Sequence, residues 1–266
     1  MARETRAAPV RANVPMLPTS AEDKGSSSSA SLPEYVQRMM RWRHMDFEYT
    51  LWQMLQLCVN PTRVYRTTMY HSRTKHAWAR DDPAFVVVIM YLLLIASVAW
   101  SLTFGERSPV AMLQLFLYVV AIDFVGVGAA LATVGWWLAN TYLHESPSRA
   151  DEWAAASRRE TVEWRYAFDV HCNAFVPMLL LLHVGQYLLL PLLLREGLLP
   201  MLVSNTLYAA AFGVYHYLTF LGYSELPFLR RAECFVYPIG AVLLAYVFSL
   251  VCMMNVTSFV TRIYFG

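Results

Sequence analysis

Long hydrophobic stretches dominate the pattern of hydrophobic and polar positions along this chain. Residues 84–104, AFVVVIMYLLLIASVAWSLTF, include no charged side chain. A helix needs about 20 apolar residues to cross a hydrocarbon core of about 30 Å, and five stretches reach this length. We therefore predict an all-α polytopic membrane protein whose membrane domain covers residues 84–266. The five predicted transmembrane helices are residues 84–104, 110–139, 174–194, 198–221 and 234–254.

A shorter, amphipathic helix is predicted before the first span. Most of its apolar residues share one half of a helix drawn at 100° per residue, and most of its polar residues share the other half, with Leu57 as an apolar exception. It is too short to cross a bilayer, and basic residues flank it on both sides. These features are typical of a helix that lies flat in the membrane interface. We expect residues 34–83 to form a basic, helical cytosolic region with this helix at its centre. The residues expected to contact lipid or a protein partner are Phe47, Leu51, Trp52, Met54 and Leu55.

Glu48 lies within the same apolar half of this helix. An unpaired carboxylate there would repel anionic lipid headgroups. We expect Glu48 to meet an arginine, and residues 140–173 are the predicted source of that arginine.

Composition argues against a soluble domain, and the distribution of charge predicts which side of the membrane each segment faces. The chain is 57% hydrophobic and 15% charged, whereas soluble domains carry about 25% charged residues. Eighteen of the 21 lysine and arginine residues lie in three segments, which the positive-inside rule places in the cytosol. The N-terminus is then cytosolic and the C-terminus luminal. Residues 1–33, rich in serine and poor in large apolar residues, predict a disordered tail. The three basic segments are residues 1–83, 140–173 and 222–233.

The cysteines give no sign of a metal site or a disulfide framework, because all four are far apart and none forms a CxxC pair. Asp169 and His171 have the spacing of two metal ligands, but no second ligand cluster accompanies them. We interpret them as part of a polar interfacial turn that leads into the third span. No metal or cofactor is predicted.

Five longer motifs carry a resemblance to a known family. Their order and spacing are similar to those of the Unc-fifty family of Golgi membrane proteins, from about Arg41 to the end of the fifth span. The resemblance implies a multi-pass, non-enzymatic Golgi protein that supports vesicular trafficking. Implied partners are an ARF guanine-nucleotide exchange factor or coat component and membrane-protein cargo, besides the lipid bilayer. The motifs are MDFEYTLWQML, WARDDPAF, IDFVGVG, WRYAFDVHCNAF and FLGYSELPFL.

Two ionisable residues fall within predicted spans. Asp123 lies near the middle of the second span, and His183 lies at nearly the same depth in the third. A charged residue at the bilayer centre costs at least about 2.5 kcal/mol, so it usually faces protein and has a partner. One interpretation is an Asp123–His183 hydrogen bond that holds the two spans together. The alternative is a small transporter or membrane enzyme that uses this intramembrane polar pair.

Small residues beside Asp123 predict close helix packing. Gly126 with Ala130, and Gly128 with Ala132, form two overlapping small-xxx-small patterns. The partner helix is either the third span or a second copy of the chain, and we favour the third span.

RNA binding is a further alternative. The resemblance includes a relative described as RNA-binding, and aromatic residues interleave with basic ones over residues 38–80. Basic residues beside a span are more often explained by membrane orientation and lipid contact, and the sequence has no RNP or KH signature.

Overall fold

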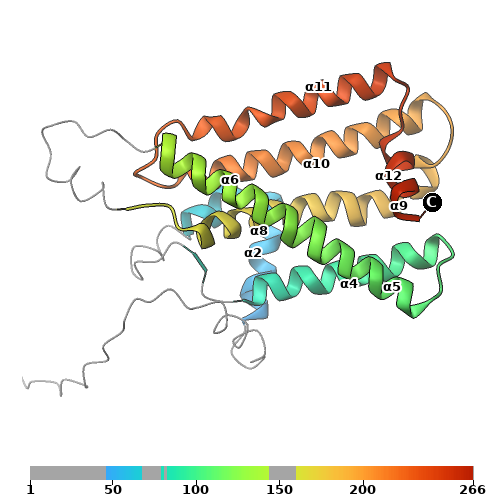
Figure 1. The fold of residues 1–266 in the computed structure, drawn as a ribbon, viewed down its shortest axis with the longest axis horizontal. Coiled ribbons are helices and arrows are strands. Elements are labelled where there is room, and N and C mark those ends of the chain that lie inside the picture. The colour runs from blue at the N-terminus through green and yellow to red at the C-terminus, as the bar shows by residue number, and fades with distance from the viewer. Residues whose placement is uncertain (1–45, 68–78, 81–82, 144–159, 266) are drawn as a thin grey trace, which may run out of the picture.

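The computed structural model describes residues 46–67, 79–80, 83–143 and 160–265, and the regular elements of these ranges are helices. Five helices are long and apolar enough to cross a membrane, which confirms the predicted five-span all-α class. Figure 1 shows the long helices side by side. Span one is α4 (Ala84–Thr103). Span two consists of α5 (Pro109–Tyr118), the π-helical segment η2 (Val119–Gly126) and α6 (Val127–Tyr142). Span three consists of α8 (Trp164–Leu179), the π-helical segment η3 (Leu180–Gly185) and α9 (Gln186–Leu193). Span four is α10 (Leu198–Ser224), and span five is η4 (Ala232–Val236) with α11 (Pro238–Val251).

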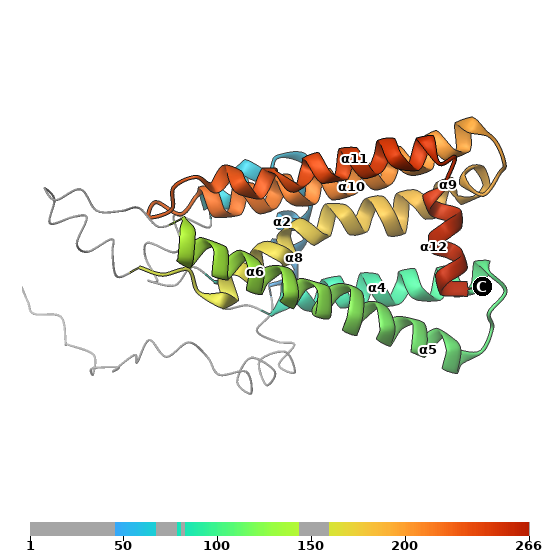
Figure 2. The same cartoon turned by 45° about the horizontal axis from the view of Figure 1, so that its top comes forward.

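Shorter helices flank the spans, and besides the two described next, residues 61–67 are also helical. The first, α2 (Phe47–Val59), begins where the Asp46 carboxylate accepts a hydrogen bond from the Tyr49 amide at 3.0 Å. It ends before Pro61, because proline cannot continue the hydrogen-bond ladder. The other, α12 (Val256–Phe265), is the last helix of the chain. In Figures 1 and 2, α12 lies at one end of the bundle, and α2 lies beside the start of α4, away from α12; we call the two sides the α2 end and the α12 end.

Span three is the centre of the packing. It contacts spans one, two and four as well as α2, whereas span five packs against span four. One apolar core joins α2 to spans one to four, and a second core lies at the α2 end. The prediction of a tail over residues 1–33 falls outside the described residues.

The helix of span three begins earlier than the predicted span. The helix begins at Trp164 rather than at residue 174, so Asp169 and His171 lie in a regular helix and not in an interfacial turn. Polar residues lower the local hydropathy there, but the structure buries them among other helices. Pro177 consequently lies inside the span instead of near its end, and the π-helical segment η3 begins three residues later.

The helix α12 was not predicted. Asn255 caps it by accepting a hydrogen bond from the Ser258 amide at 3.1 Å. Thr257 and Thr261 are buried on one face, while Phe259 and Ile263 are exposed on the other. The C-terminal segment thus folds back onto the end of the bundle (Figure 2).

Candidate functional site

A cavity of about 440 Å³ lies within the bundle, between its middle and α12. Its walls come from spans one to four, including the two π-helical segments, and from α12, and most of the lining side chains are apolar. π-helical turns are rare, and they occur frequently at functional sites. Here both of them border the same cavity. Polar side chains on the walls include Ser97, Asp123, His183, Gln186, Tyr208, Thr261 and Tyr264.

Asp123 is paired with α12. The Tyr264 hydroxyl donates a hydrogen bond of 2.6 Å to Asp123 Oδ2. Burial, and then the bond to the carboxylate, raise the pKa of Tyr264, so the phenol keeps its proton and acts as the donor. This contact ties the C-terminal helix to the middle of span two.

His183 borders the same cavity but makes no side-chain hydrogen bond to any residue that the structure describes. Its Nδ1 atom is buried, and its backbone carbonyl accepts a bond from Trp100 Nε1 at 3.2 Å. The expected Asp123–His183 hydrogen bond is therefore not formed. Asp123 is bonded instead to Tyr264, which α12 supplies. The two predicted residues share a cavity instead of a bond.

Polar residues of span four hold the beginning of α12. Ser204 Oγ accepts a bond from the Thr257 amide at 2.9 Å, and Asn205 Oδ1 accepts one from the Val256 amide at 3.0 Å. Asn205 Nδ2 also donates to the Met254 carbonyl at 2.8 Å. Both Ser204 and Asn205 are buried. They satisfy the free amides at the start of α12, which otherwise lack intrahelical partners.

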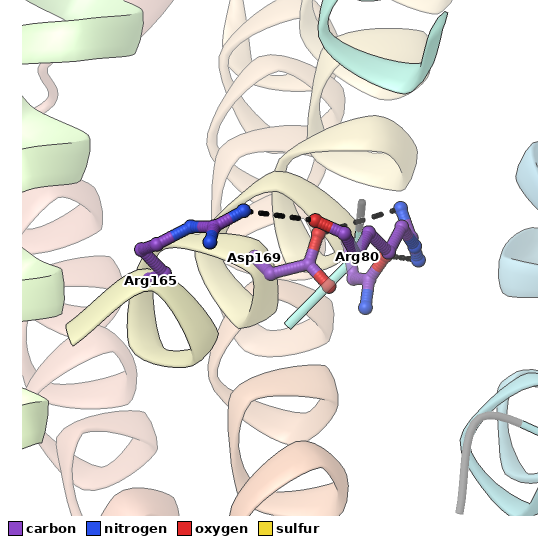
Figure 3. Close-up of polar contacts among 4 residues, drawn as sticks. Arg80, Arg165 and Asp169 are labelled. Carbon is purple, nitrogen blue, oxygen red and sulfur yellow. Dashed lines mark hydrogen bonds and ion pairs between the residues drawn. The ribbon is translucent and has the colours of Figure 1, made fainter. Parts of the chain in front are cut away.

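A second polar cluster lies at the α2 end (Figure 3). Arg80, which leads into span one, donates a hydrogen bond to Asn173 Oδ1, and its Nη1 lies 3.6 Å from Asp169 Oδ1. Arg165 Nη2 donates to the Arg80 carbonyl at 3.4 Å. The Arg80 guanidinium also lies over the Phe85 ring, 4.0 Å from its centroid. The Arg80 and Asp169 side chains are only 14% and 15% exposed, so this cluster is a partly buried attachment of span one to span three.

The small residues of span two divide between two faces. Gly128 and Ala132 are buried, and a Cβ on Gly128 would lie 2.3 Å from His171 Nε2 of span three. Gly126 and Ala130 are exposed. The small-xxx-small pattern that faces protein is the one at Gly128 and Ala132, and its partner is span three of the same chain.

The helix α2 packs on α4 and α8 through a face that includes Thr50, Gln53, Met54 and Leu57. Met54, which the sequence assigned to the outward face, is therefore buried in the core. Leu57, which did not fit the predicted apolar half, anchors the helix to the bundle.

The outward face of α2 is apolar. Leu51 and Leu55 are 55% and 62% exposed, whereas Phe47 and Trp52 are half-buried. Glu48 is also exposed, and the structure shows no ion pair between it and the arginines it describes. The prediction of an arginine partner stays a prediction, because Arg149, Arg158 and Arg159 of the expected source lie outside the described residues.

The class of protein follows from these features. In the part of the chain that the structure describes, five apolar helices, joined by buried polar contacts and flanked by shorter surface helices, define a polytopic helical membrane protein. Within the described ranges, no group of three His, Cys, Asp or Glu side chains is placed to hold a metal ion. The structure thus offers two places for function, the cavity and the α2 surface.

The chain belongs to the UNC-50 family, whose sequence model matches residues 35–265. It is 44% identical to a protein unc-50 homolog from Dictyostelium discoideum, over 91% of this chain and 92% of that protein. Identity to the Homo sapiens homolog is 41%, over 87% of this chain and 86% of the relative. Identity to protein unc-50 of Caenorhabditis elegans is 40%, over 87% and 73%. No solved structure matches this chain.

Several residues that build these sites were not predicted. Tyr264 and Arg80 lie near the ends of predicted elements, where hydropathy gives no information about contacts. One local signal for α12 was present, since Asn255 is a favourable N-cap and Thr257, Thr261 and Tyr264 follow at helical spacing. No comparable signal pairs Arg80 with Asp169, because 89 positions of sequence separate them.

Proposed function

We propose that this protein is a non-enzymatic trafficking factor of the Golgi membrane whose α2 end recruits an ARF guanine-nucleotide exchange factor. Membership of the UNC-50 family, which is not a known enzyme family, supports the class. Surface delivery of membrane-protein cargo would depend on the recruited factor. The N-terminus and the α2 end would face the cytosol, and the C-terminus would be luminal.

One observation carries this proposal. The helix α2 is fixed to the bundle through Met54 and Leu57, yet it presents Leu51, Leu55 and Val59 outward. Val59 is 75% exposed. These three residues recur at a spacing of four, so they form one apolar row along the helix. A rigid apolar row at a basic end of the molecule suits an exchange factor that must bind close to the bilayer.

The test is recovery of the factor with the tagged, detergent-solubilised full chain. Leu51→Asp together with Leu55→Asp should abolish recovery, because two carboxylates would be buried against the partner. Phe259→Asp is the matched control, since Phe259 is 53% exposed on α12 at the opposite end. All three proteins should elute as single symmetric peaks. Recovery of the exchange factor with the double variant would contradict the proposal.

Two alternatives stay predictions. If the protein is a transporter or enzyme that works through Asp123 and His183, Asp123→Asn should abolish transport or catalysis but still allow recovery of the exchange factor. RNA binding would show as crosslinking that depends on residues 1–83.

A further inference from the structure

The cavity between the spans and α12 has the features of a ligand site within the bilayer. We propose that it binds an uncharged lipid with a hydroxyl headgroup and a hydrocarbon body, taken from the leaflet on the α12 side. Sterols, diacylglycerols and ceramides share this chemistry.

The size and lining of the cavity suit such a molecule. Its volume of about 440 Å³ lies within the roughly 300–1,000 Å³ of small-molecule sites. Phe175, Met178, Leu182 and Phe212 give it apolar walls. The apolar body of a ligand would contact these walls in place of lipid tails, and the few polar groups of the cavity would fix the orientation of the ligand.

The entrance faces hydrocarbon. Val127 of span two is 47% exposed, Phe212 of span four is 42% exposed, and Ile263 of α12 is 64% exposed. All three line the cavity and also reach the surface of the bundle. Because this rim is apolar, a ligand would enter sideways from the bilayer.

The polar end of the cavity has hydrogen-bonding capacity that the protein leaves unused. The His183 imidazole has no partner among the described residues, and its Nδ1 is buried. A buried polar atom without a partner costs about 1–3 kcal/mol, so such atoms call for an explanation. Asp123 lies in the same cavity and has one oxygen bonded to Tyr264. A ligand hydroxyl, which both donates and accepts, is able to serve either residue.

The charges of the lining select against other headgroups. No lysine or arginine lines the cavity, and Asp123 is its one carboxylate among the described residues. A phosphate headgroup would therefore lack a cationic partner and would be repelled by a carboxylate. This favours an uncharged headgroup over phosphatidylserine or phosphatidic acid.

The two π-helical segments give the site its shape. Asp123 belongs to Val119–Gly126 and His183 to Leu180–Gly185, so each segment contributes one ionisable residue to the cavity. A π turn departs from the regular packing of an α-helix. The two π segments that face this cavity therefore differ in backbone geometry from the α-helical parts of the bundle. They bring Asp123 and His183 into one cavity whose other lining side chains are mostly apolar.

The experiment uses the purified full chain in nanodiscs with photoactivatable lipid probes. Separate samples carry a sterol, a diacylglycerol, a ceramide or a phosphatidylserine probe, and labelled peptides are mapped by mass spectrometry. Val127→Trp should block the entrance. Val134→Trp is the matched control, because Val134 is 53% exposed on α6 and does not line the cavity. His183→Leu should remove the hydrogen bond to the ligand.

Labelling by at least one hydroxyl lipid should fall about fivefold or more in both Val127→Trp and His183→Leu. For His183→Leu, fivefold is the factor that corresponds to the loss of one ordinary hydrogen bond. Val134→Trp should label like the wild type, and labelled peptides should come from spans two, three and four. The preferred hydroxyl probe identifies the lipid. Equal labelling in all variants would overturn the proposal, as would a preference for phosphatidylserine. His183→Leu removes no protein hydrogen bond that the structure shows, so its folding should be intact, and unchanged thermal stability verifies this.

Discussion

Replacing Gly128 with alanine should destabilise the membrane domain, because spans two and three touch at this glycine. A Cβ on Gly128 would lie 2.3 Å from Nε2 and 2.5 Å from Cδ2 of His171, well inside van der Waals contact. The imidazole has little room to retreat. Its Nδ1 is 2.8 Å from the Tyr215 hydroxyl, and phenylalanine rings surround it.

The size of the effect follows from overpacking, which typically costs about 1–3 kcal/mol. For a chain of this length, that corresponds to a fall in Tm of roughly 2–12 °C. Alanine also favours helix over glycine by about 1 kcal/mol, which acts in the opposite direction. Gly213→Ala is the matched control, since a Cβ there meets nothing within 4 Å. The predicted difference between the two variants is therefore about 1–3 kcal/mol.

The assay is thermal unfolding of the purified full chain in one detergent, followed by the loss of the monodisperse elution peak. His171→Ala in the Gly128→Ala background makes room for the new methyl group. It should cost less stability there than in the wild type, because the clash is relieved. If Gly128→Ala and Gly213→Ala had the same Tm, the close contact between spans two and three would be refuted.

Three other predictions concern buried polar contacts. Arg80→Gln should lower the unfolding free energy by about 1–3 kcal/mol, because it removes the contacts of the Arg80 guanidinium with Asp169 and Asn173; adding Asp169→Asn should restore part of the loss in the same thermal assay. Asn205→Ala should release the start of α12, seen as faster amide exchange at residues 256–261, with no change in span one. Tyr264→Phe should lower the unfolding free energy by about 1–3 kcal/mol, because it removes the hydrogen bond to Asp123. In an Asp123→Leu background the same substitution should cost much less, and a double-mutant cycle in unfolding free energy measures this difference.

Much of the fold could be predicted because the bilayer imposes a strong constraint on local sequence. The run of apolar residues at 84–104 coincides with α4, and α2 ends just before Pro61, as predicted. Span three was placed too late because Asp169 and Asn173 make its first turns polar. Their cost is offset by Arg80, which hydropathy cannot detect.

The candidate site was predicted only in part. Asp123 and His183 were identified because ionisable residues within spans are rare, and both line the cavity. Their hydrogen bond is not formed, and Asp123 is bonded instead to Tyr264, 141 positions away in the chain, which no local pattern could indicate. On α2, the apolar half includes the exposed Leu51 and Leu55, but it also includes the buried Met54.

The sequence by itself determined the number of spans, the presence of an amphipathic helix before them, and the basic end of the bundle. These follow from length, hydropathy and charge, which act along the chain. Tertiary structure alone decided which face of each helix meets protein. Lipid tails are as apolar as leucine, so hydrophobicity does not set the rotation of a span about its axis. That rotation is set by close packing at Gly128 and by the buried contacts of Arg80, Asn205 and Tyr264, and it creates the cavity.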